Sequence, residues 1–94
     1  MPSYLVETFL ARGATGERRT RENRARSVAE ELARAGTRIR FDRSIHVPED
    51  EICFFVFDAP SSREAALVAE QAALDPIRVV EAVSSDNSDR EEEG

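Results

Sequence analysis

The chain has 94 residues, which is room for one domain of ordinary size. Its formal net charge of −6 disfavours nonspecific binding to nucleic acid. No apolar run approaches the roughly 20 residues that a membrane-spanning helix needs, and the first residues lack the basic region of a signal peptide. We therefore expect a soluble, cytoplasmic domain over residues 1–83. Residues 84–94 are acidic, have no apolar anchors and predict a disordered tail.

The first third of the chain predicts a strand followed by a helix. Tyr4 to Leu10 is rich in β-forming residues and predicts the strand. Beyond a turn at 12–16, apolar residues recur at helical spacing and predict a helix ending near Ala35, with Gly36 in the position of a C-terminal glycine. The apolar positions of this helix are Ala25, Val28, Ala29, Leu32 and Ala33.

The middle of the chain predicts a β-hairpin. Residues 38–47 alternate, which predicts a strand with Ile39, Phe41, Arg43 and Ile45 on one face, so that Arg43 interrupts an otherwise apolar surface. Residues 48–50 form a short connection, and 51–58 predict the next strand.

The last third predicts a second helix and a fourth strand. Residues 60–64 open the helix, and Ser61 and Glu64 have the spacing of a capping box. Asp75 and Pro76 are expected to end it, and 77–83 predict the last strand. The buried stripe of this helix is expected to consist of Ala65, Val68, Ala69 and Ala72.

These elements predict an α+β fold of the ferredoxin-like βαββαβ type, a four-stranded antiparallel sheet with two helices on one face. The run from Ile52 to Phe57 contains no polar residue, whereas an antiparallel strand with one wet face should alternate. Because the helices cover only one face, we expect a homodimer in which a second copy covers the other.

With this layout, the chain resembles a family of small actinobacterial ferredoxin-like proteins, most of them uncharacterised, that includes a nickel-binding member. The resemblance lies in residues 4–7, 39–44, 54–61 and 78–83. It implies a dimeric α+β barrel and, in at least one relative, nickel binding. We therefore expect a divalent metal, nickel or zinc, or a small ligand to be held in a cavity of the fold. The nickel-binding relative has a histidine near its first strand, whereas this chain has His46 alone.

The residues that could ligate such a metal are acidic side chains and one imidazole. Glu7 and Glu81 lie in the first and last strands, which are neighbours in this fold, so their carboxylates are expected to approach each other. The alternative is that both are solvated or pair across the sheet with Arg40, Arg43 or Arg78. His46 is either a ligand or an exposed loop histidine. Cys53 is either a further ligand or a small buried hydrophobic residue. The predicted metal set is Glu7, Asp42, His46 and Glu81.

Two other functions remain open. A cofactor-free enzyme of the dimeric barrel type, a monooxygenase or isomerase, would use Glu7 or His46 as general base, with Arg40 orienting an anionic substrate. The second open function is that of a purely structural or partner-binding domain. The arginines from Arg18 to Arg26 form either a solvated face or a phosphate-binding surface.

Overall fold

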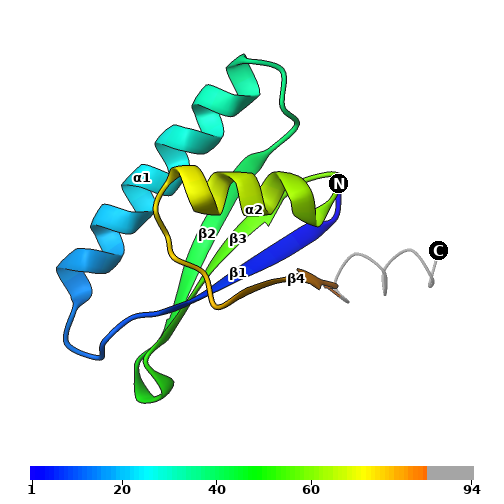
Figure 1. Ribbon diagram of the computed structural model, residues 1–94. Coiled ribbons are helices and arrows are strands. Elements are labelled where there is room, and N and C mark those ends of the chain that lie inside the picture. Colours follow the sequence, from blue (N-terminus) through cyan, green and yellow to red (C-terminus); the bar gives the residue numbers. More distant parts are fainter. Residues whose placement is uncertain (85–94) are drawn as a thin grey trace.

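The computed structural model describes residues 1–84 (Figure 1). The predicted acidic tail lies, apart from Ser84, outside the described residues. The order of the elements within 1–84 is β1 (Ser3–Phe9), α1 (Thr15–Arg34), β2 (Arg40–Val47), β3 (Ile52–Asp58), α2 (Ser62–Gln71) and β4 (Arg78–Ala82). The strands form one four-stranded antiparallel sheet in the order β2-β3-β1-β4. This confirms the predicted ferredoxin-like α+β fold.

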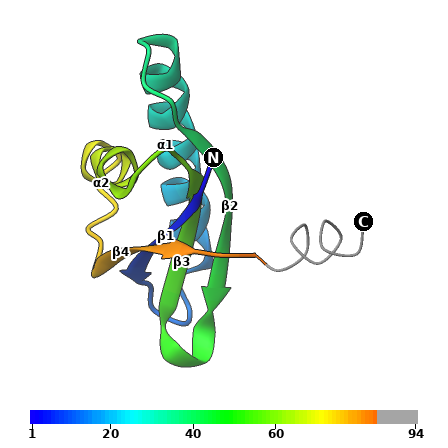
Figure 2. The same cartoon turned by 90° about the vertical axis from the view of Figure 1, so that its right-hand side faces the viewer.

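Both helices lie on the same side of the sheet (Figures 1 and 2). On that side the central strand β3 presents Cys53, Phe55 and Phe57, all fully buried. The helices meet these rings with small side chains, and Ala25 of α1 and Ala65 of α2 are also fully buried. Because alanine allows close approach of helix and sheet, the phenylalanines fill the space between the two layers.

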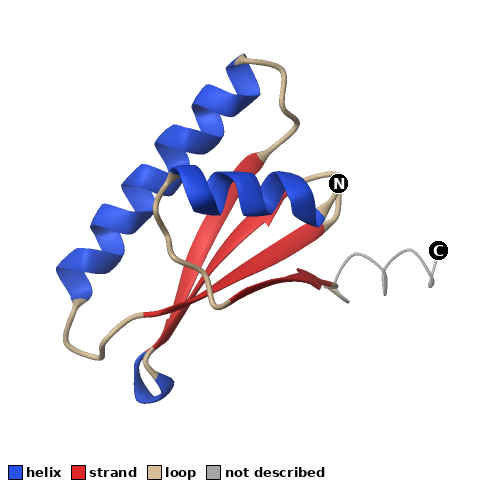
Figure 3. Ribbon diagram, viewed as in Figure 1, coloured by secondary structure: helices blue, strands red, loops and turns tan. Residues whose placement is uncertain are grey.

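The element boundaries differ from the predicted ones by a few residues at most, except at the end of α2. A single turn of 3₁₀ helix at Pro48–Asp50 connects β2 to β3 (Figure 3). Helix α2 ends at Gln71, well before Asp75 and Pro76, which were expected to end it. The reason is a backbone turn at Ala73, described below.

A β-bulge in β2 overturns the predicted alternation of that strand. Phe41 pairs with Phe57 and Arg43 pairs with Val56, so the register shifts by one residue at Asp42. The extra residue turns Phe41 toward the helices and Arg43 away from them. Arg43 therefore does not interrupt the apolar face that contains Phe41, because the two side chains lie on opposite faces of the sheet.

Both helices end in the same backbone motif with different residues at its key position. In α1 the N–H groups of Gly36 and Thr37 donate to the carbonyls of Ala33 and Leu32, at 3.1 and 2.8 Å. This is a Schellman motif, which requires a left-handed residue that is usually glycine. Gly36 has φ +106°.

In α2 the corresponding bonds run from Ala73 to Glu70 and from Leu74 to Ala69, at 3.1 and 2.9 Å. Ala73 takes the left-handed position with φ +56°. Arg24 of α1 supports this end, since its guanidinium donates to the carbonyls of Ala72 and Ala73 at 2.8 and 3.2 Å. A cation placed at a helix C-terminus also offsets the negative end of the helix dipole.

The start of α2 confirms Ser61 as the N-cap. Its hydroxyl oxygen accepts a hydrogen bond from the backbone N–H of Arg63, and its O–H donates to the Glu64 carboxylate. The hydrogen bond from the Ser61 hydroxyl, followed by bonds from backbone N–H groups, lowers the pKa of Glu64 below 4.5. The capping-box spacing of the sequence therefore predicted a real interaction.

We expect Ala73→Gly to raise the free energy of unfolding by about 1 kcal/mol, because the left-handed conformation costs an L-residue about 1–2 kcal/mol and glycine nothing comparable. The same change at Ala66, inside α2, should lower it by about 0.5–1 kcal/mol. Gly36→Ala should also be destabilising because of the positive φ of +106°, although a Cβ at this position meets no atom within 4 Å. Urea unfolding at fixed protein concentration measures all three; a destabilised Ala73→Gly variant would contradict the prediction.

Ser61→Ala should lower stability by about 1 kcal/mol at neutral pH, the usual cost of losing an N-cap. The depressed pKa of Glu64 contributes stability above the unfolded value of 4.5 and loses it as the pH falls through the lower folded value. The difference between wild type and Ser61→Ala should therefore shrink below pH 4.5. Ser62→Ala, one residue along and exposed, is the control. If the difference in stability between wild type and Ser61→Ala stayed constant on acidification, the effect of the cap would not depend on the Glu64 carboxylate, which would contradict the prediction.

Candidate functional site

The side of the sheet that faces away from the helices, here called the outer face, is largely apolar. Its residues follow from the register, in which Val56 lies between Arg43 and Leu5, and Phe54 between Ile45 and Glu7. In Figure 2 no described helix lies on this side. We call its contiguous apolar residues the outer patch: Leu5, Phe9, Ile45, Val47, Ile52, Phe54, Val56 and Val80.

Solvent reaches the rim of the outer patch more than its centre. Val56, in the middle, is 5% exposed, whereas Ile45 and Phe9 are 40% and 57% exposed. Isolated exposed apolar residues are common on protein surfaces, but a contiguous patch marks a contact surface. The patch shows that β3 is apolar on both faces and that, within residues 1–84, a layer of helices covers only one of them.

The charged residues of the outer face are paired with each other. Glu7 accepts a hydrogen bond from the Arg78 guanidinium at 2.6 Å, across the β1–β4 pair. Asp58 pairs with Arg40 and accepts a hydrogen bond from the Ser3 hydroxyl. The outer face is therefore apolar with neutralised charges, rather than acidic or basic.

The expected approach of Glu7 to Glu81 is wrong. Glu7 is opposite Arg78 on the outer face, whereas Glu81 is opposite Tyr4, whose side chain faces the helices. The two carboxylates thus project from opposite faces of the sheet. The alternative, pairing with an arginine across the sheet, is what the structure shows for Glu7.

His46 and Asp42 do not join either carboxylate. His46 lies opposite Cys53 on the helix side of β2, and its Nε2 atom is buried without a hydrogen-bond partner among the described residues. It is half-buried rather than an exposed loop residue. Asp42 is the bulged residue and pairs with Arg43 at 2.6 Å. Within residues 1–84 no three His, Cys, Asp or Glu side chains are grouped to hold a metal ion.

Cys53 is not grouped with such ligands within the described part of the chain. It is fully buried, and this burial raises the pKa of its thiol, against smaller opposing effects of Arg18 and Arg21. Its backbone carbonyl accepts a hydrogen bond at 2.9 Å from the buried hydroxyl of Thr8. The side chains of residues 1–84 therefore do not group to hold a divalent metal, and nickel or zinc binding stays a prediction.

The arginines of α1 divide between structural contacts and solvent. Arg24 caps α2, and Arg21 donates to the Phe9 carbonyl at 2.9 Å and pairs with Glu17. Arg26 lies over the Phe41 ring, with its guanidinium carbon 5.1 Å from the ring centroid. Three of the five arginines are thus engaged in separate contacts within the chain, which favours the solvated face over one phosphate-binding surface.

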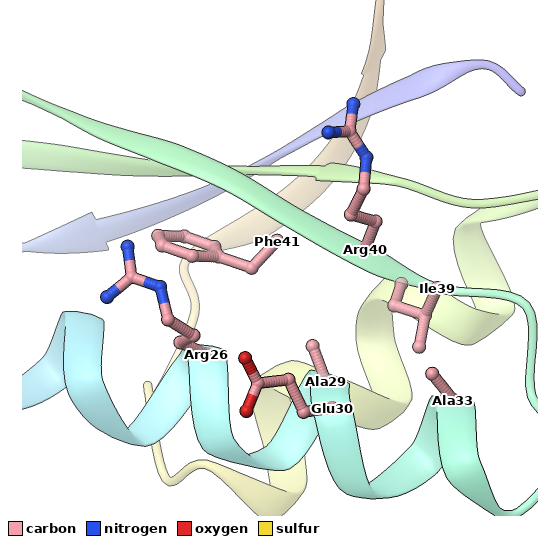
Figure 4. A pocket seen from close by; sticks show the side chains of 7 residues that line it. All are labelled: Arg26, Ala29, Glu30, Ala33, Ile39, Arg40 and Phe41. Carbon is pink, nitrogen blue, oxygen red and sulfur yellow. The ribbon is translucent and has the colours of Figure 1, made fainter.

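A hollow of about 370 Å³ lies between α1 and the edge strand β2 (Figure 4). Sequence reasoning missed it, because the hollow forms only where α1 packs beside the edge strand β2. Here it is called the α1–β2 hollow, and it is lined by Arg26, Ala29, Glu30, Ala33, Ile39, Arg40 and Phe41. A second hollow lies beside α2 near Ala73 and Pro76. Neither is lined by Glu7 or His46, so neither offers the pocket that the enzyme alternative needs.

Comparisons with protein families, with curated proteins and with solved structures find no match for this chain. The fold is thus established by the topology alone. Within the described residues, neither helix combines the length and the apolar character needed to cross a membrane.

Because the predicted metal ligands are not brought together, we expect calorimetric titration with nickel or zinc to give the same heats for wild type and His46→Ala. Arg78→Gln, which frees the Glu7 carboxylate, tests whether the ion pair with Arg78 blocks a site. A heat present in the wild type and lost in His46→Ala would return the histidine to a metal site and contradict this expectation.

Proposed function

We propose that the chain is a homodimeric, non-catalytic binding domain in which two outer patches pack together as a dimeric α+β barrel. The observation that carries the proposal is the outer patch itself, with Phe9 and Ile45 exposed beside the buried Val56. Side chains on strands about 4.8 Å apart, rising about 3.3 Å per residue, make this patch roughly 300 Å² in projection. That is the size at which exposed apolar patches on monomers are often functional.

A second copy of the chain is the occupant that the charges favour. In a two-fold interface each surface meets its own copy, so an unpaired charge on it meets a like charge. Here Glu7 is neutralised by Arg78, Asp58 by Arg40 and Arg43 by Asp42 within the chain, so two outer faces do not repel. Fully burying a large apolar side chain contributes up to about 1.5–3 kcal/mol, which supports association through several such residues.

Membership of the small actinobacterial ferredoxin-like family is part of the same proposal. The βαββαβ order and the β2-β3-β1-β4 sheet support it, together with the similarity in residues 54–61, which run from β3 into the cap of α2. In this reading the dimer is a scaffold, and its ligand is held by side chains outside the sheet-to-sheet contact.

We expect sedimentation velocity to show a dimer for the wild type and a monomer for Phe9→Glu and Ile45→Glu. Both residues are exposed in the single chain, so a carboxylate there should leave the fold intact. In the dimer it would be buried without a partner, at a cost of several kcal/mol, which weakens association at least about 100-fold.

Ser27→Glu, at an exposed position of α1 on the opposite layer, is the matched control and should remain dimeric. Circular dichroism checks that each variant is folded. A wild-type chain that is monomeric at micromolar concentration, or a dimer unaffected by Phe9→Glu, would overturn the proposal.

A further inference from the structure

The α1–β2 hollow has a rigid apolar floor. Phe41 packs against Phe57 and Phe55, with ring centroids 5.3 and 6.4 Å apart, so its orientation is fixed from the core side. Ile39 and Ala29 continue the floor and are 5% and 2% exposed. Figure 4 shows these side chains between the helix and the edge strand, with Ala33 facing Ile39. A hollow of about 370 Å³ with such a lining is within the usual range of small-ligand sites.

Two opposite charges border this floor. Arg26 and Glu30 lie one turn apart on α1 and flank Ala29, on the side of the helix that faces β2 (Figure 4). The guanidinium of Arg26 contacts the Phe41 ring. Within residues 1–84, no hydrogen bond or ion pair engages either Arg26 or Glu30, so guanidinium donors and carboxylate acceptors both remain for a ligand.

The third charge at the hollow is occupied elsewhere. Figure 4 shows the Arg40 side chain running away from the floor to the far side of β2, where its guanidinium pairs with Asp58. Only its stem lines the hollow. The polar groups available to a ligand are therefore one cation and one anion, about one helical turn apart.

We propose that the α1–β2 hollow binds a free α-amino acid with an aromatic or large apolar side chain. The ligand carboxylate accepts hydrogen bonds from Arg26, its ammonium donates to Glu30, and its side chain lies on Phe41, Ile39 and Ala29. A carboxylate without an amine faces repulsion from Glu30, and an amine without a carboxylate faces repulsion from Arg26. A zwitterion satisfies both groups at once, which neither singly charged compound does.

This inference rests on the proposed binding role and deepens it by naming the ligand class. The hollow lies between α1 and the edge strand β2 and contains no residue of the outer patch, so a monomeric variant should retain it. The bulge at Asp42 and the neighbouring charged residues of β2 also disfavour an added peptide strand at this edge, which favours a small molecule over an extended peptide.

The test is a titration of the full chain with L-phenylalanine, followed by amide chemical shifts and by calorimetry. L-phenylalaninamide, 3-phenylpropionate and glycine each lack one part of the ligand: the carboxylate, the amine or the side chain. We expect phenylalanine to bind with shifts at residues 26–33 and 39–41, and each of the other three to bind at least 10-fold more weakly.

Two variants locate the charges. Arg26→Gln should weaken phenylalanine about 10-fold and abolish the preference over phenylalaninamide, while Glu30→Gln should abolish the preference over 3-phenylpropionate. Arg34→Gln and Glu31→Gln, exposed on the same helix but outside the hollow, are the matched controls and should bind as the wild type does.

The monomeric variant Phe9→Glu should bind phenylalanine with unchanged affinity, so that failure of the dimer and failure of the site give different results. The proposal would be overturned if phenylalanine did not bind at a concentration of about 10 mM. Equal affinity for all four compounds, or shifts outside the hollow, would overturn it as well.

Discussion

The structure depends on covering the central strand β3. Its helix side is covered within the chain, because α1 and α2 place small side chains such as Ala25 and Ala65 over Phe55 and Phe57. Its other side is as apolar, yet it meets only the neighbouring side chains of its own sheet. A sheet with two apolar faces and one layer of helices leaves one face without a covering layer, and the proposed homodimer rests on this imbalance.

The bulge at Asp42 connects the two faces. By shifting the register of β2, it places Phe41 in the core layer and Arg43 on the outer face. Without the extra residue, either the phenylalanine would be lost from the core or a charge would enter it. The bulge also leaves the Phe41 ring at the edge of the core, where Arg26 covers it only in part and a hollow remains beside α1.

Arginine serves here largely as a structural residue. All thirteen basic residues are arginine, and the guanidinium groups of Arg24 and Arg78 satisfy a helix end and a strand carboxylate. A planar group with five donors suits such contacts better than a lysine ammonium does. The basic character of α1 therefore does not imply an anionic partner, and Arg26 differs from Arg21 and Arg24 because its guanidinium makes no hydrogen bond within residues 1–84.

The sequence by itself determined the order of the elements, the burial of the α2 stripe and the Ser61–Glu64 cap, because each depends on residues close together in the chain. It also indicated that β3 is apolar on both faces. Only the tertiary structure decided which side chains meet across strands. The pairing register placed Glu7 and Glu81 on opposite faces, and a single bulged residue reversed the direction of Arg43 relative to Phe41. Side-chain direction in a strand alternates with every residue, so a register shift of one, which no local pattern encodes, changes every contact that a site needs.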